Sequence, residues 1–281
     1  MILFKNSDQL GQYISHVQSN GRKTALIPTM GALHAGHLSL VDAGKKSGYL
    51  TICSIFVNPT QFNDPKDFEK YPITIEKDIY KLEKEGTDIL FLPTIDQVYP
   101  QGFPRNEKYD LGQLEKVFEG QFRPGHFQGV CQVMFRLLSI IEPDHLFMGQ
   151  KDYQQCMVIK WLINFMKSKT VFHGCPTVRE PDGLAMSSRN VRLNEEQRKR
   201  ATTIFESLSY LKNNLSKGNL SALLDKARSI LTARGFKIDY LDIADADNLE
   251  RVGIWDGRQK LVALAAAFLD EIRLIDNIVL N

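Results

Sequence analysis

The sequence predicts an α/β protein with a Rossmann-like, doubly wound parallel sheet, followed by a smaller C-terminal α+β domain. Up to about Cys175, short apolar runs alternate with helical patterns. These runs are apolar throughout, which is typical of strands covered on both faces. The rhythm of strand, helix and strand indicates βαβ units, and ligands of such sheets bind beyond the carboxyl ends of the strands.

The expected elements follow this rhythm along the chain. In the first part, strands are expected at 23–28, 49–57, 87–93, 145–149 and 170–176, with helices near 37–46, 74–85, 128–141 and 153–167. In the second part, charged amphipathic stretches predict helices over 195–215 and 219–234, and apolar runs predict strands over 236–245 and 260–269. The two domains are therefore expected over 1–176 and 177–281.

The composition is that of an ordinary globular protein, with 43% hydrophobic and 24% charged residues. The 35 basic and 33 acidic residues give a net charge of +2, so there is no electrostatic case for a nucleic-acid or anionic-membrane partner. The apolar run 261–269 is too short to span a bilayer. Since the N-terminus does not resemble a secretory signal, we expect a cytoplasmic protein.

The cysteines agree with that expectation. Cys53, Cys131, Cys156 and Cys175 are widely spaced and form no Cys-x-x-Cys pair. No histidine lies at a spacing typical of a zinc site. We therefore expect reduced thiols in the core, with neither disulfides nor metal ligands among them.

The segment PTMGALHAGH (28–37) follows the first expected strand and precedes a helical run. A strand, a glycine-containing turn and a helix start form a phosphate site, because unpaired backbone N–H groups and the helix dipole both favour an anion there. His34 and His37 are three residues apart, so one helical turn would direct both at that anion. The alternative is a pair of surface or helix-capping histidines.

Two further segments offer phosphate donors. In MSSRN (186–190), Ser187, Ser188 and Arg189 supply two hydroxyls and a guanidinium, although the alternative is an ordinary polar loop. In MGQKDYQQ (148–155), an expected strand ends at Gly149, where a backbone can approach a ligand closely. The lysine of this segment suits phosphate oxygens, and the aspartate after it suits a helix cap or a ribose hydroxyl.

Two loops carry further polar side chains. In VNPTQF (57–62), Asn58 and Gln61 offer amide groups that suit the hydroxyls of a small substrate, and the alternative is a turn that begins with asparagine. In RPGHFQGV (123–130), Arg123 or His126 is placed to meet a phosphate, and the alternative is a histidine that caps local backbone.

Five segments, in this order and spacing, resemble the pantothenate synthetase (pantoate–β-alanine ligase) family: GALHAGH, FVNPTQF, RPGHFQGV, GQKDYQQ and VREPDGLAMSSRN. They span about 22–192, and RLIDN (273–277) fits as well. The family belongs to the nucleotidylyltransferases, which share a Rossmann-like core and a His-x-Gly-His motif. The resemblance implies an ATP-dependent condensation of (R)-pantoate with β-alanine to pantothenate, through a pantoyl adenylate, with release of pyrophosphate and AMP.

The resemblance also implies roles for the two domains and for individual residues. Residues 1–176 would bind ATP and pantoate, 177–281 would form a lid, and the protein would be a homodimer. The implied catalytic residues are His37 as acid, His34 as its partner on the phosphates, Lys151 and Arg189. The implied ATP contacts are Met30, Gly31, Ala32, Leu33, His34, Ala35, Gly36, His37, Gly149, Gln150, Lys151, Asp152, Val178, Met186, Ser187, Ser188 and Arg189. The implied pantoate contacts are Gln61, which β-alanine shares, and Gln155.

Some positions depart from the family pattern. The family commonly has arginine after Tyr-Pro, where this chain has Ile73, and glutamate before Lys-Asp, where it has Gln150. ATP implies Mg²⁺, and Asp78 is the candidate ligand, although the favoured alternative is an ordinary solvated helix face. Its neighbour is Lys77, where some members have a second aspartate.

Two other functions fit parts of the pattern. One is another adenylate-forming transferase that loads an amino acid onto RNA, which would need a basic face or an added RNA-binding domain. The other is a regulatory protein that binds nucleotide without turnover. The second is opposed by an intact donor set, namely His34, His37, Lys151, Ser187, Ser188 and Arg189, and a turnover assay would decide whether it applies.

Overall fold

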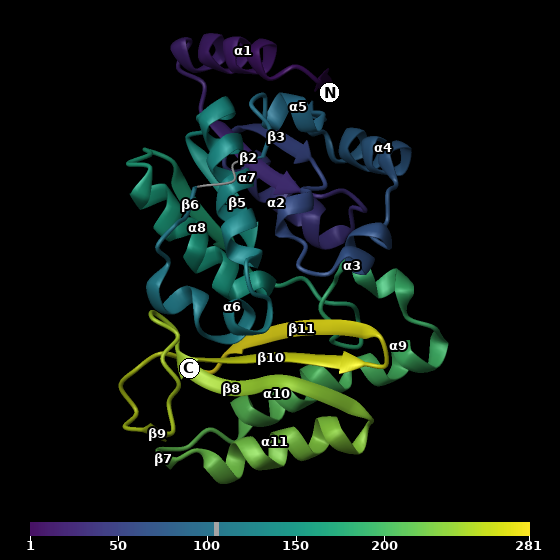
Figure 1. Cartoon of the computed structure of the whole chain (residues 1–281), viewed down its shortest axis with the longest axis vertical. Helices are drawn as coiled ribbons and strands as arrows, with labels where there is room; N and C mark the ends of the chain where they lie inside the picture. Colours follow the sequence, from purple (N-terminus) through teal and green to yellow (C-terminus); the bar gives the residue numbers. More distant parts are fainter. Residues whose placement is uncertain (104–106) are drawn as a thin grey trace. The chain divides into compact units, whose positions relative to one another are not determined.

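The computed structural model describes residues 1–103 and 107–281. In this part of the chain, six strands form a sheet in the order β1-β4-β3-β2-β5-β6 (Figure 1). Each neighbouring pair is parallel, so the predicted doubly wound α/β core is confirmed. The strands are β1 (Ile2–Phe4), β2 (Thr24–Thr29), β3 (Leu50–Ile55), β4 (Ile89–Phe91), β5 (His145–Gly149) and β6 (Val171–Cys175).

The four expected helices of this core are present near their predicted bounds. The sequence missed three short helices, given below as α3, α5 and α6, and two elements near the N-terminus. The sequence did not predict strand β1, because it is a short edge strand in which Ile2 and Leu3 are exposed. Helix α1 follows it, and the side chain of Asn6 caps its start by accepting from the Gln9 N–H at 2.9 Å. The helices are α1 (Ser7–Ser19), α2 (Ala35–Lys46), α3 (Pro65–Glu69), α4 (Ile75–Glu85), α5 (Ile95–Val98), α6 (Phe118–Phe122), α7 (His126–Ile141) and α8 (Tyr153–Phe165).

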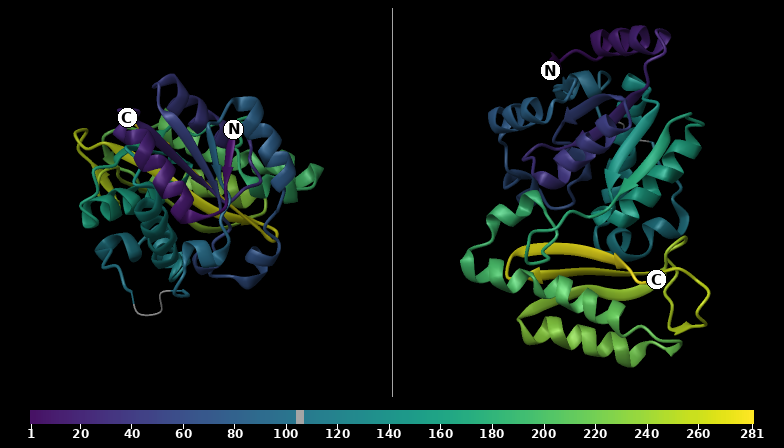
Figure 2. Two further views of the ribbon diagram at one scale, coloured as in Figure 1. Left: turned by 90° about the horizontal axis from the view of Figure 1, so that it is seen from above. Right: turned by 180° about the vertical axis from the view of Figure 1, so that it is seen from behind.

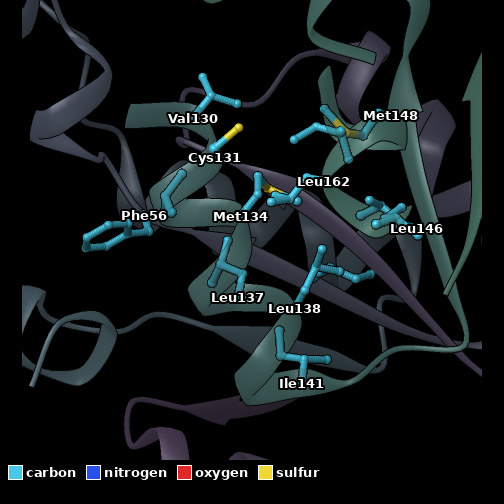
Figure 3. Packing of buried hydrophobic residues seen from close by; sticks show 14 of the residues in the cluster. Phe56, Val130, Cys131, Met134, Leu137, Leu138, Ile141, Leu146, Met148 and Leu162 are labelled. Atoms are coloured by element: carbon cyan, nitrogen blue, oxygen red, sulfur yellow. The ribbon is translucent and has the colours of Figure 1, made fainter. Parts of the chain in front are cut away.

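Both faces of the parallel sheet are covered, which explains the uninterrupted apolar runs. Along β2, Leu26 packs into a core with α1, α7 and α8, while Ala25 and Ile27 pack into a second core with α2 and α4. Figure 3 shows how α7 fills the first of these cores. The residues labelled there are Phe56, Val130, Cys131, Met134, Leu137, Leu138, Ile141, Leu146, Met148 and Leu162.

A second compact unit contains an antiparallel sheet of three strands within the described residues, in the order β11-β10-β8. The strands are β8 (Phe236–Asp245), β10 (Leu261–Leu269) and β11 (Ile272–Val279). Helices α10 (Thr203–Asn213) and α11 (Ser221–Ala233) pack on this sheet, as Figure 2 shows in green beside the yellow strands. A smaller pairing joins β7 (Gly218–Asn219) to β9 (Ile254–Trp255).

One expected helix of this unit is interrupted. Instead of one helix over 195–215, α9 (Glu195–Ala201) ends one residue before α10 begins. The residue between them is Thr202, whose hydroxyl donates to the Lys199 carbonyl at 3.0 Å. Such a local bond from a threonine side chain competes with the regular helix, so the break has a physical cause.

The contacts divide the chain into one unit of residues 1–150 and 154–176 and another of 151–153 and 177–281. Residues 151–153 thus group with the C-terminal sheet, although they follow β5 directly. None of the helices in the described residues has the length and apolarity needed to cross a membrane. Burial raises the pKa of the Cys53 and Cys131 thiols to about 12, so neither is a nucleophile at neutral pH.

The amino ends of β2 and β5 are joined by Asp144. The ladder between these strands is short, since it pairs Ala25 with His145 and Leu26 with Leu146. The Asp144 carboxylate accepts from the Thr24 N–H at 3.0 Å, from the Thr24 hydroxyl at 3.1 Å and from Lys23 Nζ at 2.6 Å. Partial burial raises the pKa of Asp144, but these hydrogen bonds outweigh it and hold the pKa below its ordinary value.

We predict that Asp144→Asn lowers the free energy of unfolding by about 1–2 kcal/mol at neutral pH, because it weakens the bonds to the buried start of β2. The carboxylate is the stabilising form, so this contribution is complete above its ordinary pKa of about 4 and is lost as the pH falls through the lowered folded value. Urea unfolding of both proteins across this pH range measures the difference. Asp42→Asn, which breaks the exposed pair with Lys46, is the matched control and should change little. A pH-independent difference for Asp144→Asn would contradict the account.

Candidate active site

The sheet has a topological switch point between β2 and β5. Strands β4, β3 and β2 lie in descending chain order on one side, and β5 and β6 in ascending order on the other. Ligands of open α/β sheets bind at such a point, beyond the carboxyl ends of the strands. The segments that follow β2, β3 and β5 begin with Met30, Phe56 and Gln150. The fold therefore places the starts of three of the predicted site segments at the carboxyl edge of the parallel sheet.

The turn after β2 is held by a buried carboxylate. Gly31 and Ala32 both have left-handed backbone, with φ of 83° and 47°. Asp78 on α4 accepts from the Ala32 N–H and from the Leu33 N–H, each at 2.8 Å, and from the Thr74 hydroxyl at 3.0 Å. Glycine adopts such angles readily, but alanine does so at a cost that the surroundings must offset. The Asp78 bonds supply that compensation, so this carboxylate fixes the shape of the turn.

These contacts bear on the magnesium role predicted for Asp78. Its side chain is fully buried, and both of its oxygens already accept hydrogen bonds from protein donors. A magnesium ligand needs an accessible oxygen, because the ion keeps several waters and phosphate oxygens around it. Asp78 as it lies here does not fit that requirement, and its contacts support the positioning of the turn instead.

His34 and His37 cap helix α2. The His34 Nδ1 atom accepts from the Gly36 N–H at 3.2 Å, and the His37 Nδ1 atom accepts from the His34 N–H at 3.3 Å. The two rings lie 4.0 Å apart between centroids. Because Nδ1 of each ring is an acceptor, the neutral imidazole carries its proton on Nε2. The two histidines therefore cap the helix, as the alternative expected. In this arrangement Nε2–H is the donor group of each ring.

The loop after β3 is fixed by Asn58, which is buried and structural. Its Nδ2 donates to the Gly129 carbonyl at 3.1 Å, and its Oδ1 accepts from the Tyr99 hydroxyl at 3.1 Å. Gln61 ends the 3₁₀ turn η1 (Pro59–Gln61), and its amide donates to the sulfur of Met30. The turn alternative holds for Asn58, while Gln61 lies beside the turn that follows β2.

Helix α7 approaches this loop so closely that only glycine fits. A Cβ on Gly129 would lie 2.1 Å from the Thr60 carbonyl oxygen. Nearby, His126 Nδ1 bonds to the Gln61 carbonyl oxygen at 2.8 Å, and its Nε2 lies 3.0 Å from Arg123 Nη1. His126 thus bonds a backbone carbonyl, but it is that of the distant Gln61 loop and not the local backbone that the alternative expected. The sequence flagged this loop but missed the role of Gly129, for which a glycine inside a helical pattern was the signal.

Other predicted residues follow β5. Gly149 ends the strand, and Gln150 begins the 3₁₀ turn η3 (Gln150–Asp152). The Lys151 side chain is largely buried, with Nζ 3.8 Å from Asp152 Oδ1. Gln155 lies half-buried on the first turn of α8. Its neighbour Gln154, which the sequence did not single out, is buried and bonded to the Leu114 and Val117 carbonyls and the Glu119 N–H.

The last predicted segment belongs to the second unit. Arg179 and Ala185 form an antiparallel bridge, and the Met186 N–H donates to the Val178 carbonyl at 3.0 Å. Ser187 then caps the 3₁₀ turn η4 (Ser188–Arg192) by accepting from the Arg189 N–H at 3.2 Å. Since the Ser187 oxygen is the acceptor in this cap, its hydroxyl hydrogen is a donor for another group.

Comparison with known proteins covers nearly the whole chain. A family model described as pantoate-beta-alanine ligase matches residues 2–279. The chain is 40% identical to a pantothenate synthetase of Bacteroides thetaiotaomicron over 266 residues, 94% of each chain. It is 38% identical to that of Cytophaga hutchinsonii, covering 100% of this chain and 99% of the relative.

Solved structures agree in fold. A pantothenate synthetase from Thermus thermophilus superposes with a TM-score of 0.90 at 34% identity, covering 99% of both chains. A pantoate-beta-alanine ligase from Francisella tularensis, complexed with beta-gamma ATP and beta-alanine, gives 0.83 at 35% identity, covering 99% of this chain and 97% of the other. Since sequence and fold match along nearly the whole length, the chain belongs to the pantoate–β-alanine ligase family.

Proposed function

We propose that the protein joins (R)-pantoate to β-alanine with ATP, through a pantoyl adenylate, and releases pyrophosphate and AMP as it forms pantothenate. Family membership supports this reaction, and the Francisella tularensis relative is complexed with beta-gamma ATP and beta-alanine. The observation that carries the proposal is the turn after β2. It combines a helix start with two histidine rings whose Nδ1 atoms face backbone N–H groups, at the switch point of the sheet.

The chemistry requires donors where charge develops. A pantoate carboxylate oxygen attacks the α-phosphorus, and the bond to the β-phosphate breaks with its electron pair left on pyrophosphate. The β-alanine amine then attacks the acyl carbon, loses a proton, and expels AMP with the electron pair of the acyl–oxygen bond. Donors fixed before the reaction stabilise the departing charge more than they stabilise bound ATP. The Nε2–H of His37 is such a donor, because protonating its Nδ1 would break the cap to the His34 N–H.

Within this proposal, the remaining residues share the binding work. The phosphates are bound by Lys151, Ser187, Ser188 and Arg189. The adenine contacts the backbone at Val178. Gln61 and Gln155 bind pantoate, and the contact of Gln61 with Met30 supports a place beside the ATP turn. We further propose that residues 1–176 form the ATP- and pantoate-binding domain, and that residues 177–281 act as its lid.

Other parts of the proposal rest on the family and on the chemistry of ATP. Magnesium accompanies the triphosphate, and phosphate oxygens and water are its usual ligands in such sites. We derive no protein ligand for it, because the contacts of Asp78 do not suit that role. We also propose that the enzyme works as a homodimer in the cytoplasm, with small molecules as its substrates.

Isotope exchange tests the proposed reaction. Because the activated acyl group resides on AMP, labelled pyrophosphate should enter ATP when pantoate and magnesium are present and β-alanine is absent. Exchange that depends on an amino acid in place of pantoate would favour the RNA-loading alternative. ATP binding without exchange under any of these conditions would favour a regulatory protein.

We predict that the two nitrogen atoms of the His37 ring, Nδ1 and Nε2, have separable roles. In His37→Asn the amide oxygen can replace Nδ1 in the cap, but nothing replaces Nε2–H. In His37→Gln the amide reaches the position of Nε2. His37→Asn should slow single-turnover pyrophosphate release by about 10²–10³-fold, the usual cost of one lost donor to developing charge, while its melting temperature stays close to wild type.

His37→Gln serves as the matched variant and should keep a larger share of the rate. Both proteins are compared at saturating ATP and pantoate, so that weaker binding does not imitate a slower step. A rate for His37→Asn within a few-fold of wild type would remove Nε2 from the mechanism. Equal losses for both variants, together with a lowered melting temperature, would leave His37 with only its capping role.

A further inference from the structure

The motif RLIDN (273–277) places two buried polar residues next to each other on β11. Asp276 and Asn277 are 4% and 6% exposed, within a strand of the C-terminal sheet. They pair with Ala265 and Leu264 of β10, so their backbone position is set by the sheet. Buried polar side chains in a strand need partners, and the proposed chemistry so far gives these two no role.

Asp276 binds Arg179 through both oxygens. The guanidinium donates from Nη1 at 2.6 Å and from Nη2 at 3.0 Å, and it stacks 4.2 Å above the Phe205 ring. Burial raises the pKa of the Asp276 carboxyl, and the arginine opposes that rise. A buried pair in this two-pronged geometry constrains direction as well as distance.

Arg179 in turn holds a hairpin. Its Nη1 also donates to the Gly183 carbonyl at 3.0 Å, across the turn from its own backbone. Gly183 has φ of 92°, and a Cβ there would lie 2.2 Å from the Phe205 ring. The hairpin that Arg179 and Ala185 bridge therefore packs closely against Phe205 of α10, within the second unit. Met186 follows Ala185 in this hairpin. The next residue is Ser187, the first side chain of the segment that is proposed to bind phosphate.

Asn277 reaches the other phosphate segment. Its Nδ2 donates to the Lys151 carbonyl at 2.7 Å, within the same compact unit. Its own carbonyl accepts from Arg179 Nη2 at 3.2 Å, and its N–H donates to Asp276 Oδ1 at 2.8 Å. The two adjacent residues thus bond to each other, to the hairpin and to the backbone of Lys151.

We propose that Asp276 and Asn277 are positioning residues for the ligase reaction, which fix the Lys151 segment and the Ser187–Arg189 segment in one arrangement. This inference rests on the proposed function, in which both segments bind ATP phosphates. Donors that stabilise a transition state must be held within a fraction of an ångström, and the residues that support them set that accuracy. Asp276 and Asn277 of RLIDN would then affect ATP through the two segments, without contacting ATP themselves.

Asn277→Ala and Asp276→Asn test the proposal in the full-length protein. Asn277→Ala removes the bond to Lys151 while its backbone bonds remain, and Asp276→Asn weakens the hold on the hairpin. Each should lower kcat/KM for ATP by ~10- to 100-fold, because displaced donors no longer meet the transition state. The KM for pantoate should change little, and this split between substrates separates positioning from a general loss of structure.

Asp239→Asn is the matched control. It breaks a partly buried ion pair of the same sheet, Arg273–Asp239 at 2.8 Å, whose two residues lie on β11 and β8. It should lower the melting temperature and leave the kinetic constants of the folded enzyme unchanged. ATP constants for Asn277→Ala that match those of the control would overturn the proposal, even if Asp276→Asn fails to fold. Lack of exchange activity in the wild-type protein would instead overturn the proposed function.

Discussion

The site depends on the bond between the Asp78 carboxylate and the turn that follows β2. Parallel strands bring their carboxyl ends to one edge, but the edge alone does not aim a helix start at a phosphate. Gly31 and Ala32 make the sharp change of direction by adopting left-handed backbone. A fully buried carboxylate from α4, that of Asp78, accepts from the Ala32 and Leu33 N–H groups and holds that shape. The histidines that cap α2 come directly after this turn in the sequence.

Each compact unit thus uses buried groups to fix segments that are proposed to bind ATP or pantoate. In the first unit Asp78 holds the histidine turn, and Asn58 and Gly129 hold the loop of Gln61. In the second unit the adjacent residues Asp276 and Asn277 hold two segments. Such groups are costly to bury unless every bond is made, so each also commits the chain to one local geometry.

Much of this could be predicted from the sequence, because the signals were local. Uninterrupted apolar runs gave the parallel strands, and spaced motifs gave the family. The supporting residues could not be predicted, since their roles depend on contacts between distant positions. The sequence suggested Asp78 as a metal ligand, but its carboxylate accepts from the Ala32 and Leu33 N–H groups. The sequence also pointed to Gln155 and not to its neighbour Gln154, which is buried and bonded to the backbone of distant residues. Edge strand β1 was missed because its exposed residues lack the buried pattern.

ATP binding to Asp78→Asn, measured by calorimetry with and without magnesium, tests the central claim most directly. The amide places an NH₂ group against a backbone N–H, so the turn should lose its shape. ATP affinity should then fall about 5- to 150-fold in both conditions, as expected for a loss of about 1–3 kcal/mol. Glu76→Gln, the same charge change at an exposed position of α4, should bind ATP like wild type. Affinity lost only when magnesium is present would contradict the account, because it would make Asp78 a metal ligand.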